Sequence, residues 1–183
     1  MIFTKWNARI TIGFTGPKKW EKELKSGNID WKAKFSNIGK ICHENRLREF
    51  NFKLLHRLTV TKELCIYGVN DKNNCPYCKE PDSILHTFVE SHYTQTFYAK
   101  VVDWFNAKFS CAFSPTSYEI LFGTDLNTSR NNELKLNYCL LFAKYNLHYQ
   151  KMFSKACNII EFVLKLEQKL LIESRLKINI FVL

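Results

Sequence analysis

The stretch Cys75-Pro-Tyr-Cys78, followed by His86 and then His92, decides how this chain is organised. Two cysteines separated by two residues can bind one metal ion from a tight turn, and Pro76 stiffens that turn. The two histidines follow closely enough to complete a set of four ligands. Zinc is the expected ion because it accepts mixed sulfur and nitrogen ligands, and four protein ligands indicate a structural site. The alternative is a pair of ordinary thiols with two surface histidines.

The residues around these ligands carry a family resemblance. The pattern Cys75-x2-Cys78-x7-His86 lies within Asn74-Cys-Pro-Tyr-Cys-Lys-Glu-Pro-Asp-Ser-Ile-Leu-His-Thr-Phe-Val-Glu90. This region resembles the zinc-binding region downstream of the reverse transcriptase in LINE-type non-LTR retrotransposons. Other segments fit in the same order: Leu47-Arg-Glu-Phe-Asn-Phe-Lys-Leu-Leu-His-Arg-Leu58, Thr59-Val-Thr-Lys-Glu-Leu64, Gly68 and Leu140-Leu-Phe-Ala-Lys-Tyr145. The resemblance touches most of residues 31–175.

This resemblance implies both a ligand set and a role. It implies a structural zinc ion and binding to element RNA or target DNA, beside a polymerase supplied by the full-length element protein. The family places its fourth ligand, a cysteine, five residues after the histidine, where this chain has Ser91. A hydroxyl is a poor zinc ligand, so His92 is predicted to replace it. A site with three ligands and a decayed site are the alternatives.

The backbone between the first histidine and the fourth ligand is expected to bend. On one straight α-helix, Ser91 would lie about 140° and His92 about 240° around the axis from His86. Neither residue would share a face with His86 in that case. A bend is therefore required whichever residue binds the ion.

The composition indicates a helical and basic protein. Of its 183 residues, 46% are hydrophobic and 15% aromatic, which suffices for a sizeable core. Only 6 Gly and 4 Pro occur, which argues against a turn-rich all-β chain. Lys and Arg outnumber Asp and Glu by 27 to 17, and residues 1–70 hold 14 basic and 6 acidic residues, a net charge of +8. Concentrated positive charge attracts polyanions, most often nucleic acid, although lysine-rich surfaces can also serve solubility alone.

The expected location is intracellular, in the nucleus or the cytoplasm. Seven cysteines without a regular framework indicate reduced thiols. Lys5, Asn7 and Arg9 interrupt any apolar core of a secretory signal. No apolar run approaches the length of a membrane span, so no membrane partner is expected.

The clearest amphipathic helix of the first half is predicted over residues 43–58. Its apolar residues follow a spacing of 3, 4 and 4: Leu47, Phe50, Leu54 and Leu58. Arg46, Lys53 and Arg57 would fall within about 20° of one line beside that face. Such a stripe can follow a phosphate backbone, and His56 adjoins it. The alternatives are a solvated face for the cations and a position on the helix surface or at the core edge for His56.

We predict a mainly α fold. Long helices are expected over 133–152 and 156–175, and in the second one apolar residues repeat at 4, 3 and 4: Ile159, Val163, Leu166 and Leu170. The chain is thereby divided into three parts: a basic irregular arm (1–30), a small helical domain with a zinc knuckle (31–124) and a C-terminal helical hairpin (125–183).

A helical pattern after His92 gathers several aromatic residues. Phe97, Trp104 and Phe105 recur with Val101 at helical spacing. Such rings can stack on unpaired bases, but this spacing is far more typical of a core.

The motifs of common enzyme classes are missing. The chain has no Gly-rich phosphate loop, no G-x-S-x-G elbow and no Asp-Asp pair of the kind that holds magnesium in polymerases. A catalytic zinc with Glu80 or Glu90 as base is disfavoured, because the H-x-E motif that deaminases place before their cysteine pair is absent. We therefore predict no enzyme activity. The functional alternatives are a host-used helical protein-interaction module and a decayed element copy without function.

Overall fold

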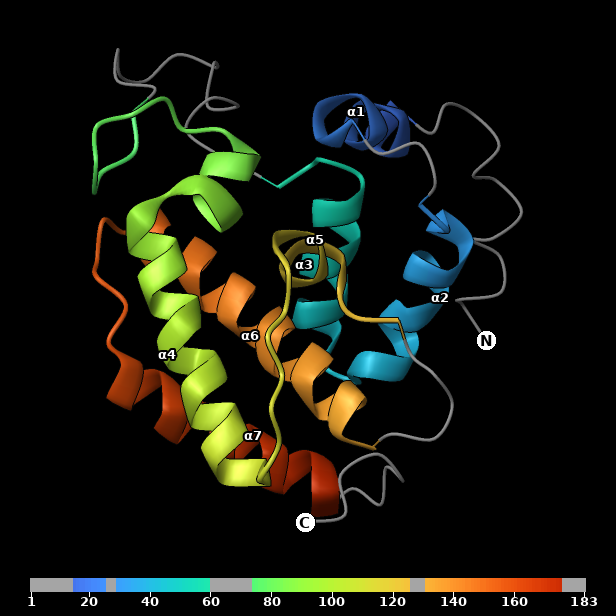
Figure 1. Cartoon of the computed structure of the whole chain (residues 1–183), viewed down its shortest axis with the longest axis vertical. Helices are drawn as coiled ribbons and strands as arrows, with labels where there is room; N and C mark the ends of the chain where they lie inside the picture. Colours follow the sequence, from blue (N-terminus) through green and yellow to red (C-terminus); the bar gives the residue numbers. More distant parts are fainter. Residues whose placement is uncertain (1–14, 26–28, 60–73, 126–130, 176–183) are drawn as a thin grey trace.

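The computed structural model describes residues 15–25, 29–59, 74–125 and 131–175, which form a mainly α fold (Figure 1). The elements are α1 (Thr15–Leu24), α2 (Trp31–Ile41), α3 (Asn45–Leu55), the π-helical turn η3 (His86–Glu90), α4 (His92–Phe109), α5 (Ser117–Phe122), α6 (Asn131–Met152) and α7 (Ile159–Arg175). No strand occurs in these ranges, and the bridge between Asn74 and Pro81 is isolated. The predicted fold class is confirmed.

Several of the sequence segments discussed above lie outside the described residues. Residues 60–64 and Gly68, which carry part of the family resemblance, lie outside the described residues, as do residues 126–130 at the predicted boundary of the hairpin. Among the helices that are described, none has the length and apolarity needed to cross a bilayer.

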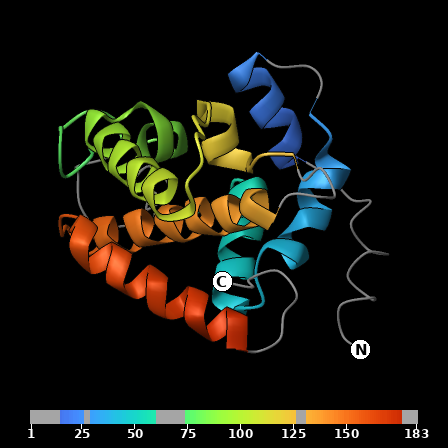
Figure 2. The same cartoon turned by 60° about the horizontal axis from the view of Figure 1, so that its bottom comes forward.

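Helix α6 is the centre of the fold. It contacts α2, α3, α4, α7 and η3, and Figure 2 shows these elements around it. Every side chain from Lys135 to Lys144 is buried. A helix that is covered all round belongs in a core rather than on a surface. The predicted hairpin does form, since the α6 ring of Phe142 stacks on Phe162 of α7 at 5.4 Å, but α6 also organises the rest of the chain.

One cluster of buried apolar side chains joins the three predicted parts of the chain. It contains Trp20 from the first part, Phe88 from the second and Leu166 from the third. The largest fully buried side chains include Trp20, Tyr138 and Phe88. The metal site is thus attached to a substantial core and does not have to hold the fold together alone.

The first part of the chain contains a helix where an irregular arm was predicted. Helix α1 spans Thr15–Leu24, and its Trp20 is 0% exposed. Gly16 lets α1 approach the end of α3 closely, because a Cβ atom at this position would lie 2.7 Å from the Cα of His56. The helix is stabilised by this tertiary contact, which its short sequence with Gly16 and Pro17 did not indicate.

Helix α3 ends at Leu55, three residues before the predicted end. His56 caps the helix, and Arg57 has a φ of 57°, in the left-handed region where helices commonly stop. Arg57 therefore does not continue the line of Arg46 and Lys53. The prediction of three cations aligned on one helix is wrong for Arg57.

Two buried lysines hold the C-terminal end of α5. The Lys144 ammonium donates to the Leu121 carbonyl at 2.6 Å, and that of Lys34 donates to the Gly123 carbonyl at 2.9 Å and to the Asp125 carboxylate at 2.8 Å. Cations are favourable at a helix C-terminus, where carbonyl groups lack partners within the helix. Burial, together with the nearby charge of Lys34, lowers the pKa of Lys144 to about 7.

Candidate metal centre

The Cys75–Cys78 segment forms a compact turn, which we call the metal turn. The Cys75 amide donates to the Glu80 carbonyl at 2.8 Å, and the Lys79 amide donates to the Cys75 carbonyl at 3.0 Å. Lys79 takes a φ of 68°, which reverses the chain direction directly after Cys78. These bonds place the two sulfur atoms on the same side of the turn as the start of η3.

The structure brings Cys75, Cys78 and His86 together. Their ligand atoms all lie within 4.8 Å of one another, and the Sγ of Cys78 is 3.1 Å from the Nε2 of His86. Cys75 and His86 are buried, whereas Cys78 is exposed. This group of two thiols and one imidazole can hold a metal ion.

The donor set suits a cation for an electrostatic reason. Partial desolvation of the sulfur atom, and then the hydrogen bond and charge interaction with Cys75, raise the pKa of the Cys78 thiol. Two thiolates at this separation repel each other, and a divalent cation between them removes the repulsion. The residues present therefore fit a thiophilic metal ion.

The backbone bends after His86, as predicted. Residues His86–Glu90 form a π-helical turn, in which the Ser91 amide donates to the His86 carbonyl at 3.1 Å. Ser91 itself is extended, with φ −62° and ψ 127°, and α4 begins at His92. In a π-turn, residue i+5 lies about one helical turn after residue i. Position 91 therefore returns toward the side of His86.

This bend separates the two candidates for the fourth ligand. His92 is exposed and does not belong to the cluster of Cys75, Cys78 and His86. Ser91 is buried, and its Oγ has no hydrogen-bond partner within the described residues. The structure thus assembles three of the four predicted metal ligands and directs His92 outward. The reason is that the π-turn brings position 91, and not position 92, back to the side on which His86 lies.

A buried ion pair anchors the metal turn to α6. The Lys151 ammonium donates to the carboxylate of Asp82 and to the Thr87 hydroxyl, the latter at 2.7 Å, and Thr87 donates to Asp82 at 2.9 Å. The side chains of Lys151 and Asp82 are 9% and 2% exposed. Sequence reasoning missed this network, because its partners are 64 and 69 residues apart and no local pattern links them.

An aromatic contact anchors the other side of the turn. The rings of Tyr77 and Tyr93 stack with centroids 4.2 Å apart, which joins the turn to α4. The Tyr77 hydroxyl donates to the carbonyl of Lys155, in the connection between α6 and α7, and the Cys157 amide donates to the Tyr93 hydroxyl. The metal turn is therefore fixed to α4, to α6 and to the connection between α6 and α7.

The predicted nucleic-acid-binding residues fall into two groups. Arg46 is exposed and makes no ion pair with other described residues, and Lys53 is exposed and pairs with Glu49 at 2.6 Å. His56 and Arg57 are half-buried. Only the first two are presented on the solvent side of α3.

His56 and Arg57 are engaged with other parts of the protein. The His56 ring packs against Phe35 and Phe52 at centroid distances of 4.8 Å and 4.3 Å, and burial lowers its pKa. The Arg57 guanidinium pairs with Glu23, and it lies 4.3 Å from the ring centroid of Trp20. These contacts correspond to the core-edge alternative for His56 and give Arg57 a structural role.

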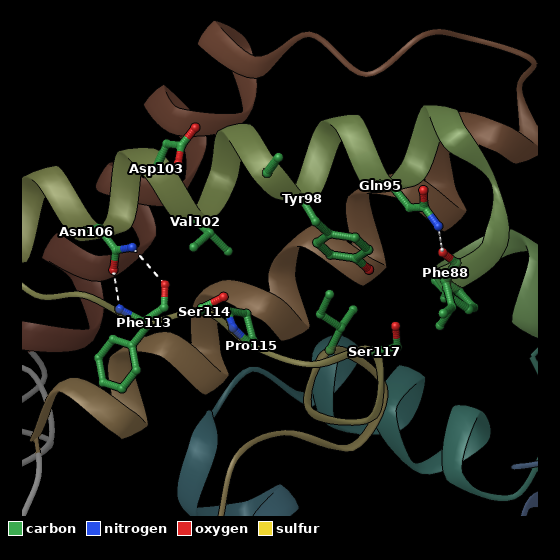
Figure 3. A pocket seen from close by; sticks show the side chains of 13 residues that line it. Phe88, Gln95, Tyr98, Val102, Asp103, Asn106, Phe113, Ser114, Pro115 and Ser117 are labelled. Atoms are coloured by element: carbon green, nitrogen blue, oxygen red, sulfur yellow. Dashed lines mark hydrogen bonds between the residues drawn. The ribbon is translucent and has the colours of Figure 1, made fainter.

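A separate pocket of about 330 Å³ lies between α4 and residues 113–117 (Figure 3). Tyr98 and Asn106 reach toward it from α4. The Asn106 amide fixes the opposite wall by donating to the Phe113 carbonyl at 2.8 Å and accepting from its amide at 2.9 Å. The one charged residue in the lining is Asp103. A pocket whose charge is a carboxylate does not suit phosphate, so nucleic-acid contacts are to be sought elsewhere on the surface.

Known proteins offer no guide to these sites: neither family models, nor curated proteins, nor solved structures match the chain. The function is therefore inferred from the residues and geometry described above.

We expect that Ser91→Cys will tighten metal binding. The π-turn returns position 91 toward His86, so a thiolate there can complete a four-ligand shell. The metal dissociation constant should fall by at least about tenfold. The reason is that loss of a group that merely orients a metal ligand already lowers metal affinity by roughly 10- to 100-fold. Competition with a chromogenic chelator measures the change.

The matched control is His92→Ala. Because His92 is exposed and outside the cluster, this variant should keep the metal affinity of the parent. If His92→Ala binds the metal more weakly than the parent and Ser91→Cys binds it equally well, His92 is the fourth ligand after all.

Proposed function

We propose that this chain is a zinc-stapled helical module that binds RNA or single-stranded or target DNA and carries out no catalysis itself. The observation that carries the proposal is the convergence of Cys75, Cys78 and His86 within 4.8 Å. These three residues are the ones that match the zinc-binding region of LINE-type retrotransposon proteins. Zinc is the metal proposed for the site, because two thiolates and an imidazole favour it over magnesium or calcium.

The charge of the chain supports a polyanionic partner. Its formal net charge is +10, and the exposed side of α3 presents Arg46 and Lys53. Phosphate contacts of this kind set affinity and orientation without reading the base sequence. By resemblance, the module would hold element RNA or target DNA for a polymerase on the full-length element protein.

A protein-interaction module remains the second proposal, and a specific observation favours it. Helix α7 exposes large aliphatic side chains on one side: Ile160, Leu164 and Leu171 are 70%, 57% and 40% exposed. Exposed apolar patches of this kind often mark protein interfaces. This surface offers no aromatic ring and is therefore better suited to a protein than to a base.

The salt dependence of nucleic-acid binding tests the proposal. Each phosphate contact contributes roughly 0.7 to the log–log salt slope on single strands. The double variant Arg46→Gln/Lys53→Gln should therefore flatten that slope by about 1.4 units. Gel shifts of a labelled single strand over a range of salt concentrations measure it, and circular dichroism verifies the fold.

Arg57→Gln is the matched control from the same predicted stripe. Because Arg57 is held by Glu23 and Trp20, its removal should lower thermal stability but leave the salt slope unchanged. Absence of any salt-dependent shift with the parent protein would contradict nucleic-acid binding and favour the protein-interaction module.

A further inference from the structure

Three aromatic rings form a ladder at the C-terminal end of α6: Tyr145 and Tyr149 belong to the helix, and Phe153 directly follows it. The three residues follow one another at intervals of four along the chain. Tyr149 is 51% exposed and Phe153 is 58% exposed, whereas most other aromatic side chains in the described ranges are buried or half-buried. Large apolar side chains gathered in one exposed place indicate an interaction site.

The rings of the ladder are arranged in a regular way. Tyr145 and Tyr149 are nearly parallel, with centroids 6.3 Å apart and an interplanar angle of 25°. Tyr149 and Phe153 follow at 4.9 Å with a tilt of 54°. Successive rings of this kind present flat faces, and every nucleobase has a complementary π-face.

The ladder is held rigidly by its surroundings. The ring of Tyr145 packs edge-on against Phe50 of α3 at 5.6 Å. At the other end the chain folds back on α6, because the amides of Phe153 and Lys155 both donate to the Gln150 carbonyl, at 3.2 Å and 2.9 Å. The ring of Tyr145 and the backbone that carries Phe153 are therefore fixed before a ligand binds, which lowers the entropic cost of binding.

Cations lie at both ends of the ladder. Phe50, which contacts Tyr145, stands on α3 between Arg46 and Lys53, four residues after the first and three before the second. Both lie within about 60° of Phe50 around the helix axis, and both are exposed. At the opposite end, Lys155 is exposed two residues after Phe153.

The metal turn adds a further cation next to the outer end. The hydrogen bond from the Tyr77 hydroxyl to the Lys155 carbonyl brings the turn to this place, and Lys79 of the turn is exposed. Acidic charge is present too, since Glu49 pairs with Lys53. Arg46, Lys79 and Lys155 make no ion pair within 4.0 Å among the described residues, so their charges remain available to phosphate groups.

We propose that Tyr149 and Phe153 stack on unpaired bases of a single-stranded nucleic acid while Arg46, Lys53 and Lys155 contact its phosphates. This inference rests on the proposed function and assigns its binding surface. Flat rings flanked by cations suit a stacked strand, whereas the aliphatic side of α7 lacks rings altogether. Phe97 and Phe105 of α4 do not offer this surface, because both are buried in the core.

Two strands of equal length separate stacking from phosphate contact: an oligothymidylate and an abasic strand with the same number of phosphates. The parent protein should bind the oligothymidylate about tenfold or more tightly than the abasic strand, because each base stacked on an aromatic ring adds to the binding free energy. Tyr149→Ala/Phe153→Ala should bind the two strands equally. Tyr149→Phe keeps the ring and should retain the difference. Fluorescence anisotropy at one fixed salt concentration measures the affinity of each protein for each strand.

The control Ile160→Ala/Leu164→Ala removes exposed apolar surface of similar extent from α7 and should retain the preference for bases. If Tyr149→Ala/Phe153→Ala keeps the preference, or if the parent binds both strands equally, the ladder is not a stacking surface, although the proposed function stands. If the folded parent binds neither strand, the proposed function fails and this inference fails with it.

Discussion

Replacing Cys78 with Ser will lower the zinc content of the purified protein from about one ion per chain to essentially none. The Sγ of Cys78 is 3.1 Å from the Nε2 of His86, so its loss removes the donor that joins the turn to η3. Cys75 and His86 alone provide only two ligands, which is too few for a structural site. Metal analysis of protein purified without chelator gives the stoichiometry.

Cys111→Ser is the control for this experiment. Cys111 is a half-buried thiol outside the metal cluster, so its replacement should leave the zinc content unchanged. Zinc retained by Cys78→Ser would rule out the assigned site.

Loss of the ion should loosen the turn without unfolding the protein. Structural zinc can supply much of the folding free energy of a small module, but here Trp20, Tyr138 and Phe88 belong to a core that does not depend on the ion. Faster amide exchange after chelation is therefore expected for residues 75–91 and not for the middle of α6.

The second large effect is expected from Lys151→Met, which should lower the free energy of unfolding by about 3–5 kcal/mol. The change removes the positive charge that faces the buried carboxylate of Asp82, and it also removes the donor to Thr87. A buried charge without its counter-charge is strongly destabilising. Urea unfolding followed by circular dichroism measures the difference.

Two further variants separate the ion pair from the loss of the side chain. Adding Asp82→Asn to Lys151→Met should recover part of the stability, because the uncompensated charge is then gone. Lys165→Met breaks an exposed pair with Glu161 and should lower stability far less than Lys151→Met does. Equal losses for Lys151→Met and Lys165→Met would mean that the buried pair does not form in solution.

Local sequence patterns were sufficient to predict much of the helical structure. At the start of α2 the Asp30 carboxylate accepts from the Ala33 amide at 2.9 Å, which is the bond expected of an aspartate directly before a helix. The spacing of apolar residues indicated α6 and α7. The Cys75–Cys78 spacing with His86 indicated the metal cluster, because a two-residue separation brings thiols together in almost any turn.

The remaining features depend on contacts between distant parts of the chain. Helix α1 forms because Trp20 is buried, and the pair of Lys151 with Asp82 links residues that no local pattern connects. The fourth metal position was assigned to His92 because a serine hydroxyl is a poor zinc ligand, but the form of the bend after His86, a π-turn, was not predictable from the residue types. Arg57 was placed on a helix that ends two residues earlier.

The π-turn η3 also determines how this segment responds to a change in its length. It holds one residue more per hydrogen-bonded turn than an α-helix does. A chain shortened by one residue between His86 and Ser91 can close as an α-turn on the same His86 carbonyl. The change is then absorbed within the turn, so α4 keeps its direction and Phe97 and Val101 stay buried in the core. The spacing between Cys78 and His86 is not affected.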